Sequence, residues 1–235
     1  MKTLGIKIPP RFQEKISFFY SKEPVYVFHH IPKCGGTSLN KVLSEWLVLV
    51  KDYRHGWTMN YDEKIDLDSL RSVHCLSGHF ELDGYYLYQR YPRVFEEKRF
   101  RVFTFVREPL QLQLSLFRYE KTNGVSQADD LEQHLARRPN YLANRFPATK
   151  ENYKDVIDKY FFVGILEKSE MSMNLLSSLL GKPFIKLPRL NHTREGNKTF
   201  AEEDIPKRLQ EKFFNDNQLD YLIYDYCVSK LNSMS

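Results

Sequence analysis

The residues best placed to do chemistry form a short loop between two apolar segments. After the apolar run 25–31 and Pro32, the chain continues with Lys33, Cys34, Gly35, Gly36, Thr37 and Ser38. Two adjacent glycines let the backbone approach a ligand closely, and the hydroxyls of Thr37 and Ser38 are hydrogen-bond donors. Lys33 adds a positive charge at the same point. This combination predicts a loop that binds a phosphate group.

The segments on either side predict how this loop is held. The β-branched and aromatic run 25–31 is typical of a buried strand. Beyond the loop, apolar residues recur at offsets of three and four, which predicts a helix with one apolar face: Leu39, Val42, Leu43, Trp46, Leu47 and Val50. Free backbone N–H groups at the start of a helix attract anions. We therefore expect the phosphate at the N-terminus of this helix.

A second pair of candidate phosphate ligands follows another apolar run. Arg107 comes directly after the predicted buried strand 101–106, and Pro109 suits the first turn of a helix that Asn123 ends. Ser115 lies eight residues beyond Arg107, about two helical turns along. An arginine from the loop and a hydroxyl from the helix can bind one phosphate together.

Histidines are the candidate bases, because their ordinary pKa lies near neutrality. Segment 73–80 reads as a further buried strand, and His79 lies at its C-terminal end, where ligands bind in open α/β sheets. His79 is therefore either a base or a structural residue, and His30 and Glu81 are the alternative bases. His74 lies early in the same strand, so we expect it to be a core residue.

The loop IPKCGGTS resembles the 5′-phosphosulfate loop of sulfotransferases that use 3′-phosphoadenosine 5′-phosphosulfate (PAPS), especially the carbohydrate type that includes the heparan sulfate enzymes. The usual form in that family is PKTGGTS, so Cys34 stands at a position where the backbone matters more than the side chain. In the nucleoside-triphosphate loop GxxxxGK[ST], by contrast, the lysine follows the last glycine. Here Lys33 precedes both glycines.

The segment RVFTFVREPLQLQLSLFRY is similar to the same family's 3′-phosphate motif, FTFVRDPxxRxxSxY. Arg107, Pro109 and Ser115 match in type and register. Glu108 replaces the aspartate and Leu112 replaces the usual arginine, which removes one supporting charge. Two phosphate motifs in the right order, about one βα repeat apart, support each other.

The resemblance implies an α/β fold of three layers, of the P-loop type, with a mainly parallel central sheet flanked by helices. It implies transfer of a sulfuryl group from PAPS to an acceptor hydroxyl, and it favours a saccharide acceptor. His79 matches the place of the family's catalytic base, and Lys33 would supply charge at the leaving phosphate. No metal is required. Segment 184–200 resembles the family's late loop over the nucleotide, with these candidate contacts: Arg189, Asn191, Thr193 and Lys198.

Length and composition limit the remaining choices. The 235 residues suit one domain, 1–235, with 1–22 packed on it as an N-terminal extension. The hydrophobic fraction of 42% and the charged fraction of 28% are those of a soluble globular protein, and no apolar run is long enough to span a bilayer. A net charge of +5, scattered along the chain, argues against a dedicated nucleic-acid binder.

The three cysteines are far apart and show no metal-binding spacing and no disulfide framework. This predicts a reducing compartment, the cytoplasm, with the Golgi lumen as the place only for a chain trimmed of a membrane anchor. Two other functions share the predicted site. One is a P-loop kinase or related phosphotransferase, which needs a magnesium-binding acid. The other is a non-catalytic module that binds a nucleotide or a glycan.

Overall fold

The computed structural model describes residues 24–55, 60–188 and 205–234. The predicted N-terminal extension 1–22 lies outside the described residues, as do the late-loop candidates from Arg189 to Lys198.

A five-stranded sheet forms the centre of the molecule, in the order β2-β3-β1-β4-β5. Every neighbouring pair of strands is parallel. The strands are β1 Val25–His29, β2 Val48–Asp52, β3 His74–Gly78, β4 Phe100–Val106 and β5 Phe162–Ile165. The predicted parallel sheet is confirmed, and β1, which leads into the phosphate loop, is its central strand.

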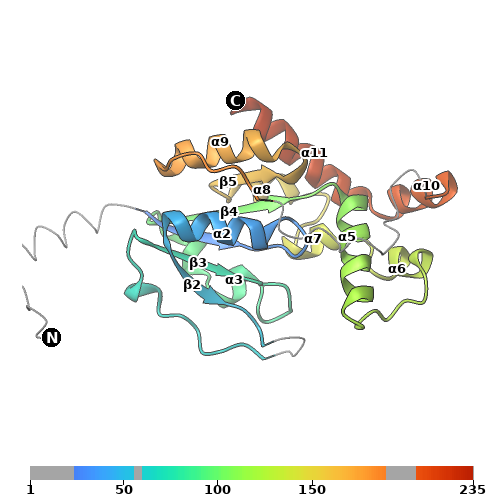
Figure 1. Cartoon of the computed structure of the whole chain (residues 1–235), viewed down its shortest axis with the longest axis horizontal. Coiled ribbons are helices and arrows are strands. Elements are labelled where there is room, and N and C mark those ends of the chain that lie inside the picture. Colours follow the sequence, from blue (N-terminus) through green and yellow to red (C-terminus); the bar gives the residue numbers. More distant parts are fainter. Residues whose placement is uncertain (1–23, 56–59, 189–204, 235) are drawn as a thin grey trace, which may run out of the picture.

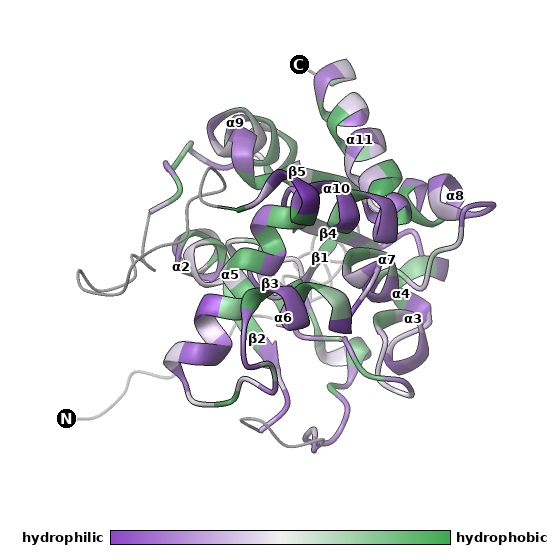
Figure 2. Ribbon diagram, turned by 90° about the vertical axis from the view of Figure 1, so that its right-hand side faces the viewer, coloured by the Kyte–Doolittle hydropathy of each residue, from purple (hydrophilic) through white to green (hydrophobic). Residues whose placement is uncertain are grey.

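Helices cover both faces of this sheet and complete the predicted three layers. Figure 2 shows α2 and α9 on one face, and α3, α4, α7, α8 and α11 on the other. In Figure 1, α5, α6 and α10 lie beyond the carboxyl ends of the strands. The bounds are α2 Gly36–Trp46, α3 Leu87–Arg90, α4 Arg93–Glu96, α5 Pro109–Thr122, α6 Leu131–Arg137, α7 Tyr141–Arg145, α8 Tyr153–Asp158, α9 Ser169–Leu180, α10 Lys207–Asp216 and α11 Gln218–Ser233, with 3₁₀ turns η1 Leu67–Ser69 and η2 Leu166–Lys168.

The core explains why β1 and β4 lie at the centre. All five residues of β1 are buried, as expected for a parallel strand covered on both faces. Phe28 of β1 stacks on Phe103 of β4, with ring centroids 5.2 Å apart. A smaller apolar cluster lies under α5 and fixes it beyond the sheet: Leu110, Leu114, Leu135, Ile205 and Phe213. The central strands and α5 are thus held firmly where the predicted site residues follow them.

One predicted element is wrong in its extent. The first helix was expected to run to Val50, but α2 ends at Trp46 and β2 begins at Val48. Leu47 is already extended, with φ −144° and ψ 159°. The β-branched Val48 and Val50 fit a strand, and β2 pairs with β3 along its whole length. Strand pairing therefore outweighs the helical spacing of the last two apolar residues.

Candidate functional site

The phosphate loop has a backbone shape that requires glycine at position 35. Gly35 precedes α2 with φ 81°, in the left-handed region that favours glycine. A Cβ atom there would lie 2.7 Å from Cδ1 of Leu166. Lys33 also has a positive φ of 65°, which is uncommon for a residue with a side chain. The loop is therefore held in a strained conformation at the carboxyl end of β1.

Gly36 is required for a different reason, which the sequence did not reveal. A Cβ atom at this position would lie 1.8 Å from Nε2 of His30. The imidazole of His30, 8% exposed, therefore occupies the space beside the first residue of α2. We expected Gly36 to let a ligand approach, and in the structure it lets the His30 ring pack directly against the loop.

The N-terminus of α2 is open to an anion. Within the described residues, no side chain caps this helix and its first turn holds no acidic residue. Thr37 is exposed and Ser38 is buried. Cys34 is 1% exposed, and burial raises the pKa of its thiol, so this side chain belongs to the core. The first-turn N–H groups and the hydroxyl of Thr37 are the groups that an anion would meet.

The two predicted phosphate motifs lie side by side. They follow β1 and β4, which are neighbours in the sheet. Nη1 of Arg107 donates a long hydrogen bond, 3.5 Å, to the carbonyl oxygen of Lys33. Nζ of Lys33 lies 4.2 Å from the ring centroid of Tyr119 on α5, a cation–π contact. The lysine and the arginine that the sequence separates by a whole βα repeat are thus in contact.

Arg118 is a third cation in this group, and it was not predicted from the sequence motifs. Burial lowers the pKa of Lys33, and the charges of Arg107 and Arg118 lower it further. Burial and Arg107 likewise lower the pKa of Arg118. A carboxylate lies beside them, with Oε1 of Glu167 3.7 Å from Nε of Arg107. A bound anion would relieve the repulsion among these cations.

The departures from the 3′-phosphate motif have structural explanations. Leu112 is 1% exposed and belongs to the main core, so a charged side chain is excluded there. Glu108 caps α5, because its Oε2 accepts a hydrogen bond of 2.7 Å from the N–H of Gln111. Ser115 is half-buried on the same helix, and Arg118 lies three residues beyond it. Residues three apart lie on the same side of a helix, which was the available signal for Arg118.

The ring of His30 lies between His79 and the phosphate loop, because it contacts both the His79 ring and Gly36. The two imidazole centroids are 4.3 Å apart, and the ring of Tyr53 is 4.8 Å from that of His79. Burial lowers the pKa of His79 to about 3, and the charge of Arg54 adds to this shift. His79 is therefore unprotonated near neutral pH. Its Nε2 is buried and has no hydrogen-bond partner among the described residues.

The neighbouring charges set the surroundings of His79. Glu81 is 8% exposed, and its Oε1 lies 2.9 Å from Nη2 of Arg54. Nη1 of Arg145 donates to the carbonyl oxygen of Glu81 at 2.6 Å. The hydroxyl of Tyr61 donates to the carbonyl oxygen of His79 at 2.7 Å. The carboxylate of Glu81 thus forms ion pairs with Arg54 and, at 3.8 Å, with Arg145.

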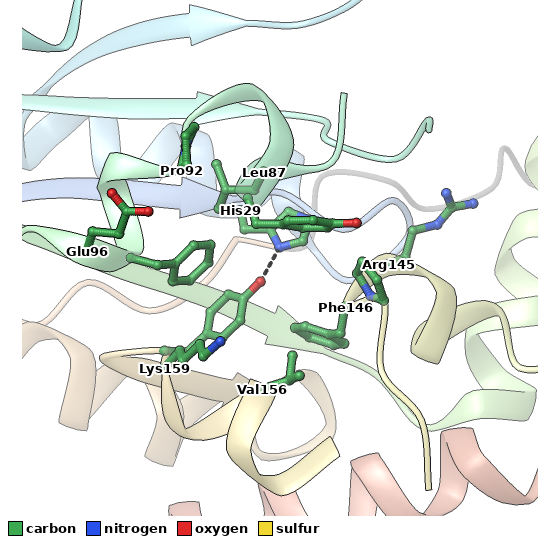
Figure 3. Close-up of a pocket in the computed structure, with 12 residues that line it drawn as sticks. His29, Leu87, Pro92, Glu96, Arg145, Phe146, Val156 and Lys159 are labelled. Atoms are coloured by element: carbon green, nitrogen blue, oxygen red, sulfur yellow. Dashed lines mark hydrogen bonds between the residues drawn. The ribbon is translucent and has the colours of Figure 1, made fainter. Parts of the chain in front are cut away.

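His29 faces the side of the sheet opposite to His30. Its Nδ1 lies 2.8 Å from the hydroxyl of Tyr160, and burial lowers its pKa to about 3. Both residues line a cavity of about 460 Å³. Figure 3 shows His29 in this cavity, whose walls include Leu87 of α3 and Val156 of α8. The cavity thus lies under helices that cover the face away from α2.

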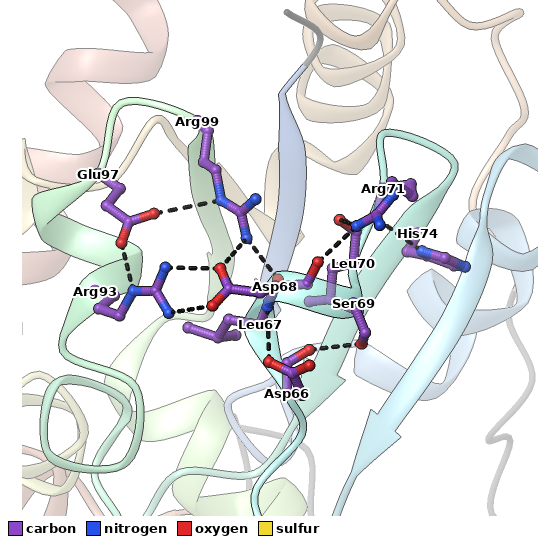
Figure 4. A network of polar contacts seen from close by, with 10 residues as sticks. All are labelled: Asp66, Leu67, Asp68, Ser69, Leu70, Arg71, His74, Arg93, Glu97 and Arg99. Carbon is purple, nitrogen blue, oxygen red and sulfur yellow. Dashed lines mark hydrogen bonds and ion pairs between the residues drawn. The ribbon is translucent and has the colours of Figure 1, made fainter. Parts of the chain in front are cut away.

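His74 has a local structural role at the start of β3. It is half-buried, so the prediction of a core residue is wrong, and its Nδ1 accepts a hydrogen bond of 2.9 Å from the N–H of Arg71. Figure 4 shows it beside a network of ion pairs around η1, in which Nη2 of Arg93 lies 2.8 Å from Oδ1 of Asp68. This network lies at the amino ends of β3 and β4, whereas the phosphate loop follows the carboxyl end of β1. The two therefore lie at opposite edges of the parallel sheet.

Two kinds of feature are absent from the described parts of the chain. No group of three or more His, Cys, Asp or Glu side chains there is arranged to hold a metal ion. No helix in those parts has the length and the apolar character needed to cross a membrane.

The protein is similar to known proteins in its structure, but its sequence matches none of those compared. No protein-family model matches the sequence, and no curated protein matches it. The structure is similar to that of a sulfotransferase from Alicyclobacillus acidocaldarius, with 13% identity and a TM-score of 0.50, over 89% of this chain and 96% of that one. It is also similar to mouse sulfotransferase SULT7A1 in complex with PAP, with 13% identity and a TM-score of 0.52, over 96% of this chain and 98% of that one. At this identity, the likeness establishes a shared fold.

Proposed function

We propose that this protein is a PAPS-dependent sulfotransferase, which transfers a sulfuryl group to an acceptor hydroxyl, with a saccharide as the favoured acceptor. The observation that carries the proposal is the contact between the two phosphate motifs, where Arg107 lies 3.5 Å from the carbonyl oxygen of Lys33. A nucleotide with a 5′-phosphosulfate and a 3′-phosphate needs both motifs at one place. The shared fold supports this, since the mouse sulfotransferase of that fold was solved with PAP.

The residues of the loop fit the nucleotide. The open N-terminus of α2 provides N–H groups, and the residues at 33–38 provide charge and hydroxyls for the 5′-phosphosulfate. Arg107 and Ser115 are the proposed ligands of the 3′-phosphate. Lys33 neutralises negative charge that develops at the leaving phosphate. When bound, PAPS supplies the activated sulfuryl group.

His79 is the proposed base that accepts the proton of the acceptor hydroxyl. With a pKa lowered to about 3, its imidazole is in the unprotonated form that a base requires. Such a base is weak in the free protein. Negative charge on a bound nucleotide would raise the pKa of His79 and so strengthen it.

The cysteines support the predicted compartment. Cys34, Cys75 and Cys227 are all buried free thiols. Free thiols are typical of a reducing compartment, and we propose the cytoplasm as the site of the reaction.

The direct test is a transfer assay. A library of hydroxyl compounds, with saccharides prominent in it, is incubated with the protein and PAPS labelled in its sulfuryl group, with and without a metal chelator. We expect label in at least one acceptor, with no effect of the chelator. Transfer of phosphate from ATP that the chelator abolishes would favour a kinase instead. Tight nucleotide binding without any transfer would favour a non-catalytic binding module.

A further inference from the structure

His30 is tied into a closed ring of hydrogen bonds formed by three other side chains. Its Nδ1 lies 3.0 Å from the hydroxyl of Tyr53. That hydroxyl lies 2.7 Å from Nδ2 of Asn40 and 2.9 Å from Oγ of Ser77. Oγ of Ser77 lies 2.8 Å from Oδ1 of Asn40, which closes the ring. These residues come from α2, the segment after β2, and β3, so the ring joins three elements beside the loop.

The hydroxyl and amide protons available in this hydrogen-bonded ring determine which nitrogen of His30 carries a proton. In the arrangement described, Ser77 donates to Oδ1 of Asn40, so the single proton of Tyr53 goes to Ser77. If the Asn40 amide were turned over, Tyr53 would donate to Asn40 and Ser77 would donate to Tyr53. In both directions the Tyr53 proton is used within the ring. The hydrogen bond to His30 then requires that Nδ1 of His30 carries the proton.

The opposite edge of the His30 ring faces the proposed active site. Nε2 of His30 lies where a Cβ atom of Gly36 would be, against the first residue of α2. The His30 and His79 rings meet edge to face at an interplanar angle of 62°. Burial also lowers the pKa of His30 well below its ordinary value, so its imidazole is neutral.

We propose that the hydrogen-bonded ring of Tyr53, Ser77 and Asn40 fixes His30 as the neutral Nδ1–H tautomer. His30 is then a positioning residue, which holds the base His79 against the phosphate loop. The tautomer follows from the hydrogen bonds alone. The catalytic part rests on the proposed function.

Nitrogen-detected NMR of the imidazoles tests the tautomer in the full-length wild-type protein. A His30→Gln variant assigns the His30 signals by their disappearance. At neutral pH we expect a protonated Nδ1 and an unprotonated Nε2 for His30. An Nε2–H tautomer or a doubly protonated ring in the wild type would overturn the proposal. The tautomer itself is read in the wild-type protein, and the variant serves only to assign the signals.

The Tyr53→Phe variant tests the positioning role, because it keeps the ring contact with His79 and removes only the hydroxyl. We expect the Nδ1–H signature of His30 to be lost and kcat to fall roughly tenfold to a hundredfold, as for other displaced catalytic groups. The affinity for adenosine 3′,5′-bisphosphate, measured by calorimetry, should stay within about twofold, since the cations that bind it are untouched.

The matched control is Tyr226→Phe on α11. It removes a hydroxyl that donates to the two carboxylate oxygens of Asp158, at 2.9 and 3.0 Å, far from the ring that holds His30. It should leave both the His30 spectrum and kcat unchanged. A Tyr53→Phe protein with normal kcat and a lost Nδ1–H signature would refute the positioning role. Failure of the wild type to bind the bisphosphate would instead refute the proposed function, so the two failures are distinguishable.

Discussion

Single residues in this site are constrained by each other as much as by any ligand. The His30 imidazole fills the space beside Gly36, and Leu166 fills the space beside Gly35. Lys33, two residues earlier, is itself in a left-handed conformation. The loop thus has little freedom to adopt another shape, which suits a site that binds charged groups in fixed positions.

Because the His30 ring packs directly against Gly36, substitutions at these two positions should have non-additive effects on the free energy of unfolding. Gly36→Ala places a Cβ atom in the His30 ring, and we expect it to lower the free energy of unfolding by about 1–3 kcal/mol, as overpacking does. In a His30→Ala background the same change should cost much less, because the ring is gone. Urea unfolding of the four proteins of this cycle measures the coupling. Additive effects would show that the clash is relieved in another way.

The low pKa of His79 predicts an unusual pH profile. A base works in its unprotonated form, and kcat/KM reports the pKa of the free enzyme. Because the pKa of His79 in the nucleotide-free protein is lowered to about 3, kcat/KM for PAPS should not fall as pH drops from 7 to 5. An unshifted histidine would lose most of its activity over that range.

The variant His79→Ala should lower turnover by about 10²–10⁴-fold and leave the affinity for the bisphosphate nearly unchanged. Near-normal turnover of the variant would move the role of base to His30 or to Glu81. An acid limb near pH 6.5 would contradict the lowered pKa of His79.

Among the elements, α5 links the core to the site. Leu112 and Leu116 belong to the main core, while Leu110 and Leu114 belong to the smaller cluster. The helix is therefore fixed on two sides, and its remaining side presents Ser115 and Arg118. A rigid helix places these side chains more exactly than a loop would.

Arg118 predicts a further contribution to nucleotide binding from α5. Its charge already lowers the pKa of Lys33, so removal of Arg118 weakens the field that attracts an anion. Arg118→Ala should raise the Kd for adenosine 3′,5′-bisphosphate by about tenfold, with a weaker dependence on salt. The control is Lys121→Ala on the same helix, where Nζ bonds the carbonyl oxygen of Asp129 at 2.9 Å. Equal small effects of both variants would contradict a specific role for Arg118.

The predicted elements differ from the observed ones for physical reasons. Strands β1 and β4 and helix α5 could be predicted because apolar runs, Pro109 and Asn123 mark them locally. Strand β2 was missed because it is short and partly exposed, and its existence depends on pairing with β3.

In the site, Lys33 and Arg107 could be predicted from their motifs. The closeness of His30 to Gly36 could not, because no local pattern encodes it. The cluster of Arg118 with Arg107 and Lys33 likewise depends on the way in which β1, β4 and α5 come together.

At the scale of the whole molecule, a buried carboxylate joins the C-terminal helix to the rest. Asp220 of α11 is 2% exposed and accepts hydrogen bonds from the N–H groups of Leu142, at 2.9 Å, and Ala143, at 2.7 Å. It thus caps the start of α7 from a distant part of the chain. The protein places this charge where water cannot reach it, and burial raises its pKa to about 6.

This raised pKa predicts that stability depends on pH through Asp220. The folded state binds the proton more tightly than the unfolded state, so the contribution of Asp220 to stability falls as pH rises from about 4 to about 6. The difference in unfolding free energy between wild type and Asp220→Asn should therefore fall across this window, with a limiting slope of about 1.4 kcal/mol per pH unit, and be constant above pH 7. Chemical denaturation at a series of pH values measures it. A difference that does not vary with pH would contradict the raised pKa.

The central claim is that the paired phosphate motifs bind a nucleotide with both a 5′- and a 3′-phosphate, and thermal unfolding with nucleotides tests it most directly. Adenosine 3′,5′-bisphosphate at about 100 times its Kd should add about 2.7 kcal/mol of stability. For a chain of this size, that raises Tm by about 5–10 °C. Adenosine 5′-phosphate and ATP with magnesium should raise it less. Strong stabilisation by ATP with magnesium, and none by the bisphosphate, would contradict the account.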